Sequence, residues 1–291
     1  MLALLYYENG DYGAAEEQCT KALALDPGCL AATELEGHIH LARGKIDSAI
    51  AEFENVLNVK GESFAIPHFN LAVALAENGQ IDEAIAEFRE AIDISPDYYE
   101  ANANLASLYI KKGEIDPSIA ACRAALGQNA DLPKAQYLLA LGLILKWEAF
   151  PSPRDDAAAG LLEEAISLCQ KALALSPDMA VAHNLVGVAY QYGGKSDLAE
   201  AEFQKALEMN PQLSSAHLNL GVLYFQNKNY AKAAHCLSQV LEIDPTTGTG
   251  LEVLDLVFKN MKRYDLLSPK KRQIPPLHSA ERQSVQPAPE G

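Results

Sequence analysis

The sequence predicts an all-α protein, a right-handed α-solenoid of seven stacked helix hairpins, the first of them incomplete. Three observations support this fold class. Prolines that follow Ala- and Leu-rich stretches recur every 34 residues, as at Pro177, Pro211 and Pro245. Small residues recur at fixed places within that period, and each period holds two apolar-periodic stretches of about 14 residues, the length of a typical helix. Such hairpins bury their apolar faces by stacking on their neighbours.

The period divides residues 1–247 into seven repeats. The first is partial and covers 1–29, and the others cover 30–64, 65–98, 99–132, 133–179, 180–213 and 214–247. Repeat 133–179 is 13 residues longer than the period, and we place the extra residues within 147–160, where Asp155 or Asp156 can cap a longer second helix that begins near Ala157. Residues 248–263 are expected to form a helix that caps the last repeat. Residues 264–291 lose the period and hold five prolines, which predicts a disordered basic tail.

Three positions of each repeat almost always hold a small residue. Small residues at a fixed register let two helices approach to about 8 Å between axes. The first position holds Ala3, Gly37, Ala72, Ala106, Ala140, Gly187 and Gly221; the second holds Ala15, Ala49, Ala84, Ser118, Ala165, Ala199 and Ala233; the third holds Ala22, Val56, Ala91, Ala125, Ala172, Ala206 and Val240. We therefore expect the two helices of each hairpin to pack closely.

Glycine and aspartate mark the junction between the two helices of a hairpin. Gly10, Gly44, Gly79, Gly113 and Gly194 follow the first helix, where a left-handed backbone conformation would end it. Asp47, Asp82, Asp116 and Asp197 lie at the start of the second helix, where a carboxylate can cap the helix or meet its dipole.

This pattern of a small residue, Tyr, Gly, a second small residue, Phe, Ala and Pro resembles the tetratricopeptide repeat. The segments GVAYQYGGKSDLAEAEFQKALEMNP (187–211) and GVLYFQNKNYAKAAHCLSQVLEIDP (221–245) carry the resemblance most clearly, and it extends over 1–247. The resemblance implies a scaffold that binds other proteins, and it says little about which ones.

Composition and motifs exclude several function classes. The chain has 39 acidic and 23 basic residues, a net charge of -16, which disfavours nucleic acid as a ligand. The longest apolar run has eight residues, so we expect no membrane span, and the N-terminus lacks the features of a signal peptide. Five cysteines without a C-x-x-C pair are typical of a reduced, cytoplasmic protein.

No motif for catalysis or cofactor binding is present in the sequence. There is no Gly-rich phosphate loop, no nucleophile elbow and no H-E-x-x-H motif. His68, His183 and His217 share one position of different repeats and should lie too far apart to bind one metal ion. We therefore expect no enzymatic activity, no cofactor and no metal.

The first helices of the repeats are expected to line the concave surface, and their stripe is unusually apolar. We predict that it binds a partner segment, with the carboxamides pairing with the partner's backbone and Lys134 meeting an acidic end. The predicted contacts are Phe69, Asn70, Val73, Asn104, Lys134, Tyr137, Leu141, Leu218, Asn219, Val222 and Phe225. The other interpretation is that these apolar residues pack on one another in a tightly wound superhelix.

Two family resemblances bear on this surface. Asn70, Asn104 and Asn219 share one position and resemble the asparagine ladder of O-linked N-acetylglucosamine transferases, although leucines interrupt it at Leu35 and two later repeats. Family members that clamp chaperone C-termini use Lys and Arg, and only Lys111 and Lys134 would be available here. That clamping role is therefore not expected.

Two further surfaces are candidates for contact. The insertion carries Trp147 and Phe150, which either protrude in a contact loop or pack against neighbouring helices. Residues 1–7 expose several leucines at an uncovered end of the array, which indicates a fragment of a longer chain, a partner at that end, or self-association.

These features predict a non-catalytic interaction scaffold, an adaptor or an assembly chaperone that captures a partner segment in its groove. Two alternatives remain open. The chain is a targeting arm of a larger enzyme, such as a glycosyltransferase, or it is a structural subunit that uses its ridges and ends.

Overall fold

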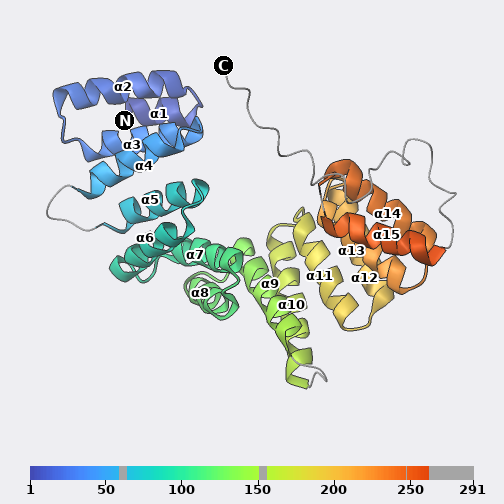
Figure 1. Ribbon diagram of the computed structural model, residues 1–291. Coiled ribbons are helices and arrows are strands. Elements are labelled where there is room, and N and C mark those ends of the chain that lie inside the picture. The colour runs from blue at the N-terminus through green and yellow to red at the C-terminus, as the bar shows by residue number, and fades with distance from the viewer. Residues whose placement is uncertain (59–63, 151–155, 247, 262–291) are drawn as a thin grey trace, which may run out of the picture. The chain divides into compact units, whose positions relative to one another are not determined.

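The computed structural model describes residues 1–58, 64–150, 156–246 and 248–261 (Figure 1). These ranges hold fifteen α-helices and no strand, as the sequence predicts. The helices are α1 Leu2–Glu8, α2 Tyr12–Leu25, α3 Leu30–Ala42, α4 Ile46–Leu57, α5 Ala65–Glu77, α6 Ile81–Ile94, α7 Tyr99–Lys112, α8 Ile115–Gln128, α9 Pro133–Ala149, α10 Asp156–Leu175, α11 Ala180–Tyr192, α12 Ser196–Met209, α13 Ser214–Gln226, α14 Tyr230–Ile243 and α15 Gly248–Met261. The predicted disordered tail lies outside the described residues.

The chain divides into two compact units. Unit 1, Met1–Lys195, holds α1 to α11, and unit 2, Ser196–Gly291, holds α12 to α15. In unit 1 each helix packs on the next one along the chain (Figure 1). A continuous core of buried side chains runs from Ala49 to Ala189. In unit 2, α13 packs on α12 and α14, and α15 packs mainly on α14 and buries Leu254 and Val257. The boundary falls inside the repeat 180–213.

The helix-ending glycines behave as the sequence predicts. The residues with positive φ are Gly10, Gly44, Gly79, Gly113 and Gly194, with φ between 70° and 80°, and Lys228 at 59°. Lys228 occupies the same position of its repeat as these glycines, so the repeat 214–247 makes the same turn without a glycine. A left-handed residue at this place reverses the chain between the two helices of a hairpin.

Asp11 caps α2, since its side chain accepts from the Ala14 amide at 3.0 Å, whereas Asp47, Asp82 and Asp116 are not the N-cap residues of their helices. The N-cap residues of α4, α6 and α8 are Lys45, Gln80 and Glu114, and none of them makes a side-chain cap bond. Asp82 instead pairs with Lys112 at 2.8 Å and Asp116 with Lys146 at 2.6 Å, so each carboxylate reaches the end of the next odd-numbered helix. These exposed pairs add little stability, while the carboxylates still meet the helix dipole.

Within each unit, close packing of the two helices of a hairpin rests on the predicted small residues. Ala49, Ala84 and Ala233 are fully buried. Gly37 leaves even less room, because a Cβ built on it would lie 2.5 Å from the ring of Phe53. Where serine replaces alanine, the buried Ser118 hydroxyl donates to the Ala106 carbonyl oxygen at 2.9 Å. A side chain larger than alanine would push the helices apart.

The insertion in repeat 133–179 lengthens its two helices. Helix α9 has 17 residues and α10 has 20, whereas α5 has 13 and α6 has 14. The expected loop at 147–160 is thus largely helical, and 151–155 lie outside the described residues.

Trp147 corrects the contact-loop interpretation. It lies inside α9 with 8% of its surface exposed, and its ring stacks on Tyr192 at 4.5 Å between centroids. Phe150, at the end of α9, is half-buried against the core. Both aromatic residues therefore pack against neighbouring helices, which is the second of the two interpretations.

Glu36 occupies a position that is apolar in the other complete repeats. Leu71, Leu105, Leu139 and Val186 hold this position in unit 1 and are at most 5% exposed. Burial, with the carboxylates of Glu52 and Glu16 nearby, raises the pKa of Glu36 above its ordinary value. The ionised form of Glu36 therefore lowers the stability of the fold at neutral pH.

We expect Gly37→Ala to lower the free energy of unfolding by about 1–3 kcal/mol, because the new methyl group collides with the buried ring of Phe53. Gly160→Ala is the matched control, since nothing lies within 4 Å of its Cβ and alanine favours the helix. Urea unfolding followed by circular dichroism measures both. Equal stability of the two variants would contradict close packing at Gly37.

We expect Glu36→Leu to raise the free energy of unfolding at pH 7 by about 1 kcal/mol, through burial of the leucine. The gain should shrink as the pH falls towards 4.5, the ordinary value for glutamate. There the wild-type carboxyl takes up the proton that its raised pKa favours, and the cost of ionisation disappears.

Thermal unfolding at pH 7 and pH 5 measures this difference. Glu83→Leu, at an exposed position of α6, is the control and should give no gain. A gain from Glu36→Leu that is the same at both pH values would contradict the role of ionisation.

Candidate functional site

The odd-numbered helices of unit 1 present a half-buried apolar stripe, which we call the odd-helix face. Phe69 and Val73 of α5 and Tyr137 and Leu141 of α9 are all partly exposed on it. They repeat at spacings of four residues, which keeps them on one side of each helix. In unit 1, α7 touches α9 and α9 touches α11, and residues of α5 and α7 line one cavity. The predicted residues of unit 1 therefore share one surface.

A cavity of about 320 Å³ opens on this face between α5 and α7, and we call it the α5–α7 cavity. Its lining combines apolar and polar groups from three helices. The lining residues are Val73, Ala76, Glu77, Phe88, Asn104, Ser107, Leu108 and Lys111. Small side chains at Ala76 and Ser107 leave the space open, while Phe88 and Leu108 are buried and supply apolar surface. A cavity of this size and lining can take one apolar side chain of a partner.

Lys111 and Glu77 both line the cavity, and Lys134 lies beside it through its bond to Asn104. The Lys134 ammonium nitrogen donates to Asn104 Oδ1 at 2.7 Å, so α9 reaches over to α7. Partial burial of the ammonium group, and secondly the charge of Lys111, lower the pKa of Lys134. Burial is the main cause of the lowered pKa, and repulsion between the two cations adds to it. An anionic group of a ligand would relieve this repulsion.

The two asparagines of the stripe in unit 1 have partners within the chain. Asn70 is 7% exposed, and its amide nitrogen donates to Glu34 Oε1 at 2.7 Å, which ties α5 to α3. This differs from the expectation that Asn70 pairs with a partner's backbone, because burial and the bond to Glu34 occupy it. The Asn104 side-chain oxygen accepts from Lys134, and the amide nitrogen of Asn104 is the group that can donate to a ligand.

Phe69 is held in an aromatic stack. Its ring lies 4.9 Å from Tyr98 in a stacked arrangement and 5.6 Å from Phe88 edge-on. Such contacts fix the ring in place, so that its exposed part forms a rigid wall of the odd-helix face.

The predicted residues of unit 2 lie on α13 and are described by themselves. Leu218, Asn219, Val222 and Phe225 are half-buried, and Phe225 lies 5.8 Å from Tyr230. They form an apolar patch on one helix side, and the cavities described in unit 2 lie elsewhere.

Helix α1 exposes leucines that the other repeats bury. Leu2 and Leu5 are each 51% exposed, whereas Leu71 and Leu108, at the corresponding positions of later repeats, are at most 4% exposed. A preceding hairpin covers those positions in the interior of unit 1. This apolar surface is where the predicted self-association or partner contact would occur.

The histidines and cysteines in the described part of the chain do not gather into a reactive or metal-binding cluster. No group of three or more His, Cys, Asp or Glu that could hold a metal ion is found among the described residues. His68 pairs with Glu87 at 2.6 Å. Burial raises the pKa of the Cys122 and Cys169 thiols to about 12, so neither forms a reactive thiolate near neutral pH.

None of the helices in the described ranges has both the length and the apolar character needed to cross a bilayer.

Stacked helix pairs with a left-handed turn inside each pair define a helical-repeat protein. Four models of the tetratricopeptide repeat match the chain, over residues 1–57 and 34–99, 75–142, 180–213 and 214–247. The chain therefore belongs to the tetratricopeptide repeat family. Residues 143–179, which hold the insertion, lie outside these matches. No curated protein sequence matches this chain.

Solved structures agree with this fold. A chain of the APC/C hetero-tetramer Cut9–Hcn1 superposes with a TM-score of 0.71 at 17% identity, over 88% of this chain and 48% of its own. This chain thus spans about half of that length. A tetratricopeptide repeat protein from Parabacteroides merdae gives 0.62 at 18% identity, over 88% and 96%. YrrB, titled a protein with an unusual peptide-binding site, gives 0.51 at 22% identity, over 70% and 97%. These identities show the fold alone.

We expect Lys111→Gln to raise the pKa of Lys134, because it removes the nearby positive charge. Lys112→Gln is the matched control, since Lys112 pairs with Asp82 and Glu114. An NMR titration of the lysine side chains measures the change. A pKa of Lys134 that responds to both variants equally would contradict a specific coupling between Lys111 and Lys134.

Proposed function

We propose that this protein is a non-catalytic scaffold of the cytoplasm, acting as an adaptor or assembly chaperone, that binds a segment of a partner protein on the odd-helix face of unit 1. The observation that carries this proposal is the α5–α7 cavity, where an apolar hollow and two lysines meet. The family is one of interaction scaffolds, and a relative of the same fold, YrrB, is titled as binding peptide. The proposed location rests on the five cysteines, all of them free.

The chemistry of the surface defines the segment that fits. One apolar side chain enters the α5–α7 cavity against Val73 and Leu108, which contributes about 1.5–3 kcal/mol when the side chain is fully buried. An acidic group next to it lies against Lys111 and Lys134. The Asn104 amide nitrogen donates to the segment's backbone. Phe69, Tyr137 and Leu141 extend the apolar contact to both sides.

The predicted residues of unit 2 enter the proposal as a second contact. Leu218, Val222 and Phe225 offer apolar surface, and Asn219 lies beside them on α13. A partner with two apolar segments gains affinity by engaging both units, because the second contact becomes intramolecular once the first has formed.

Peptide display from a library of natural protein segments tests this function. We expect selected peptides to combine an apolar residue with a neighbouring Asp, Glu or C-terminal carboxylate. Lys111→Gln should weaken their binding by about tenfold, equivalent to 1.4 kcal/mol, and Val73→Glu should weaken it further. Lys112→Gln, one position away, is the control.

Isothermal titration at low and high salt measures these affinities, with circular dichroism to show that the variants keep their helices. Peptides that bind equally well to wild type, Lys111→Gln and Val73→Glu would contradict the proposed surface.

A further inference from the structure

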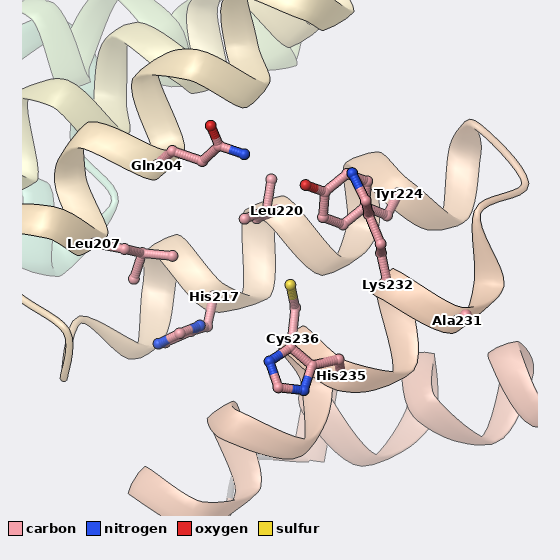
Figure 2. A pocket seen from close by; sticks show the side chains of 9 residues that line it. All are labelled: Gln204, Leu207, His217, Leu220, Tyr224, Ala231, Lys232, His235 and Cys236. Atoms are coloured by element: carbon pink, nitrogen blue, oxygen red, sulfur yellow. The ribbon is translucent and has the colours of Figure 1, made fainter. Parts of the chain in front are cut away.

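A second cavity lies within unit 2, on the side of the even-numbered helices, and we call it the outer pocket. It measures about 630 Å³ and is formed by α12, α13 and α14 (Figure 2). Its lining is apolar in the middle and polar at the rim. The lining residues are Gln204, Leu207, His217, Leu220, Tyr224, Ala231, Lys232, His235 and Cys236. The odd-helix face of unit 1 has no part in this pocket.

The same pocket occurs in unit 1, 115 positions earlier, and there it holds an arginine. Arg89, Leu105 and Tyr109 correspond to Gln204, Leu220 and Tyr224. The Arg89 guanidinium donates to the Tyr109 hydroxyl oxygen from Nε at 3.1 Å and from Nη2 at 2.7 Å. The remaining cavity measures about 360 Å³. The repeat geometry therefore offers a place for a guanidinium against a tyrosine.

In unit 2, Gln204 replaces the arginine, while the tyrosine that would contact a guanidinium is kept as Tyr224. Gln204 is shorter than Arg89 and uncharged, which leaves the larger cavity. The Tyr224 hydroxyl donates to Glu200 Oε1 at 2.6 Å, whereas Ile85 holds the position of Glu200 in the earlier pocket. The combination of a carboxylate and an aromatic ring attracts a planar cation such as guanidinium.

Lys232 supplies only a weak cation to this pair. Its ammonium nitrogen lies 3.5 Å from Glu200 and 4.7 Å from the centroid of the Tyr224 ring. The Lys232 side chain is 56% exposed, so little free energy holds it there. An arginine with apolar neighbours would compete well, because it adds bidentate hydrogen bonds and buries apolar surface.

We propose that the chain's own C-terminal segment, residues 262–291, docks in the outer pocket, with Arg272 against Tyr224 and Glu200 and with Ile274 on the wall formed by Leu207 and Leu220. Charge supports this occupant. Residues 196–261 hold eight acidic and four basic residues, and residues 262–291 hold six basic and three acidic ones. A segment of net charge +3 thus follows a unit of net charge -4.

Chain length also supports this occupant. Helix α15 packs on α14 and ends at Met261, eleven residues before Arg272. Eleven extended residues span about 36 Å, which is enough to cross a unit of this size. Because the segment is tethered, its effective concentration at the pocket reaches about the millimolar range, so that even weak contacts populate the docked state.

Trypsin digestion of the full chain tests the docking. Gln204→Arg places an arginine where Arg89 lies in the earlier pocket, fills the outer pocket and should release the segment. We expect cleavage at Lys270, Lys271 and Arg272 to be at least about threefold faster than in wild type, since cleavage follows the population of the released form. Lys205→Arg, on the neighbouring position, keeps its charge and should leave the rate unchanged.

A second measurement uses Cys236, which lines the pocket and is 6% exposed. Arg272→Glu should speed alkylation of Cys236 by iodoacetamide by at least about threefold in the full chain, because the pocket opens more often. Cys122, which is fully buried in unit 1, is the internal reference. Mass spectrometry of the labelled peptides gives both rates.

Equal cleavage rates in wild type and Gln204→Arg, or an alkylation rate of Cys236 that Arg272→Glu leaves unchanged, would overturn the proposal. Protection that disappears on about a hundredfold dilution would also overturn it, because a tethered segment is protected at any protein concentration. Helicity measured by circular dichroism shows that each variant has folded.

Discussion

Within each unit, the close contact between the two helices of a hairpin is the constraint on which the rest of the structure depends. Ala49, Ala84 and Ala233 are fully buried, and Gly37 faces the ring of Phe53 with no room for a methyl group. Because the contact recurs with the period of the sequence, side chains about 30 residues apart meet repeatedly, as Asp82 meets Lys112. Two of the cavities also lie at corresponding places of different repeats.

Much of the fold could be predicted from the sequence, because the same pattern of small residues, turn glycines and apolar positions recurs in several repeats. The spacing of Gly44, Gly79 and Gly113 is enough to predict the left-handed conformation that they adopt. Only one repeat contains the insertion, so the sequence predicts the longer second helix but leaves open whether Trp147 is buried or exposed. Its extra residues lengthen α9 and α10, and Trp147 is buried because the lengthened helix continues the apolar side of α9.

The sequence predicts only part of the candidate site, namely the apolar stripe along the first helices of the repeats. Helical spacing places Phe69, Val73 and Tyr137 on one side, but the stripe does not reveal that the small residues Ala76 and Ser107 leave a cavity between two helices. Nor does it reveal that Asn70 is bonded to Glu34, because that contact depends on the offset between successive helices. The outer pocket was missed altogether, although a comparison of Arg89 with Gln204 in the aligned repeats could have indicated it.

The account separates two surfaces of one repeat protein. The odd-helix face of unit 1 is the surface that we propose for a partner, and the outer pocket of unit 2 is the site that we propose for the chain's own C-terminal segment. Mapping a selected peptide by NMR chemical shifts tests the central claim most directly. We predict that the largest changes fall on Val73, Asn104, Lys111 and Lys134. Changes confined to the even-numbered helices, with these four residues unaffected, would contradict the account.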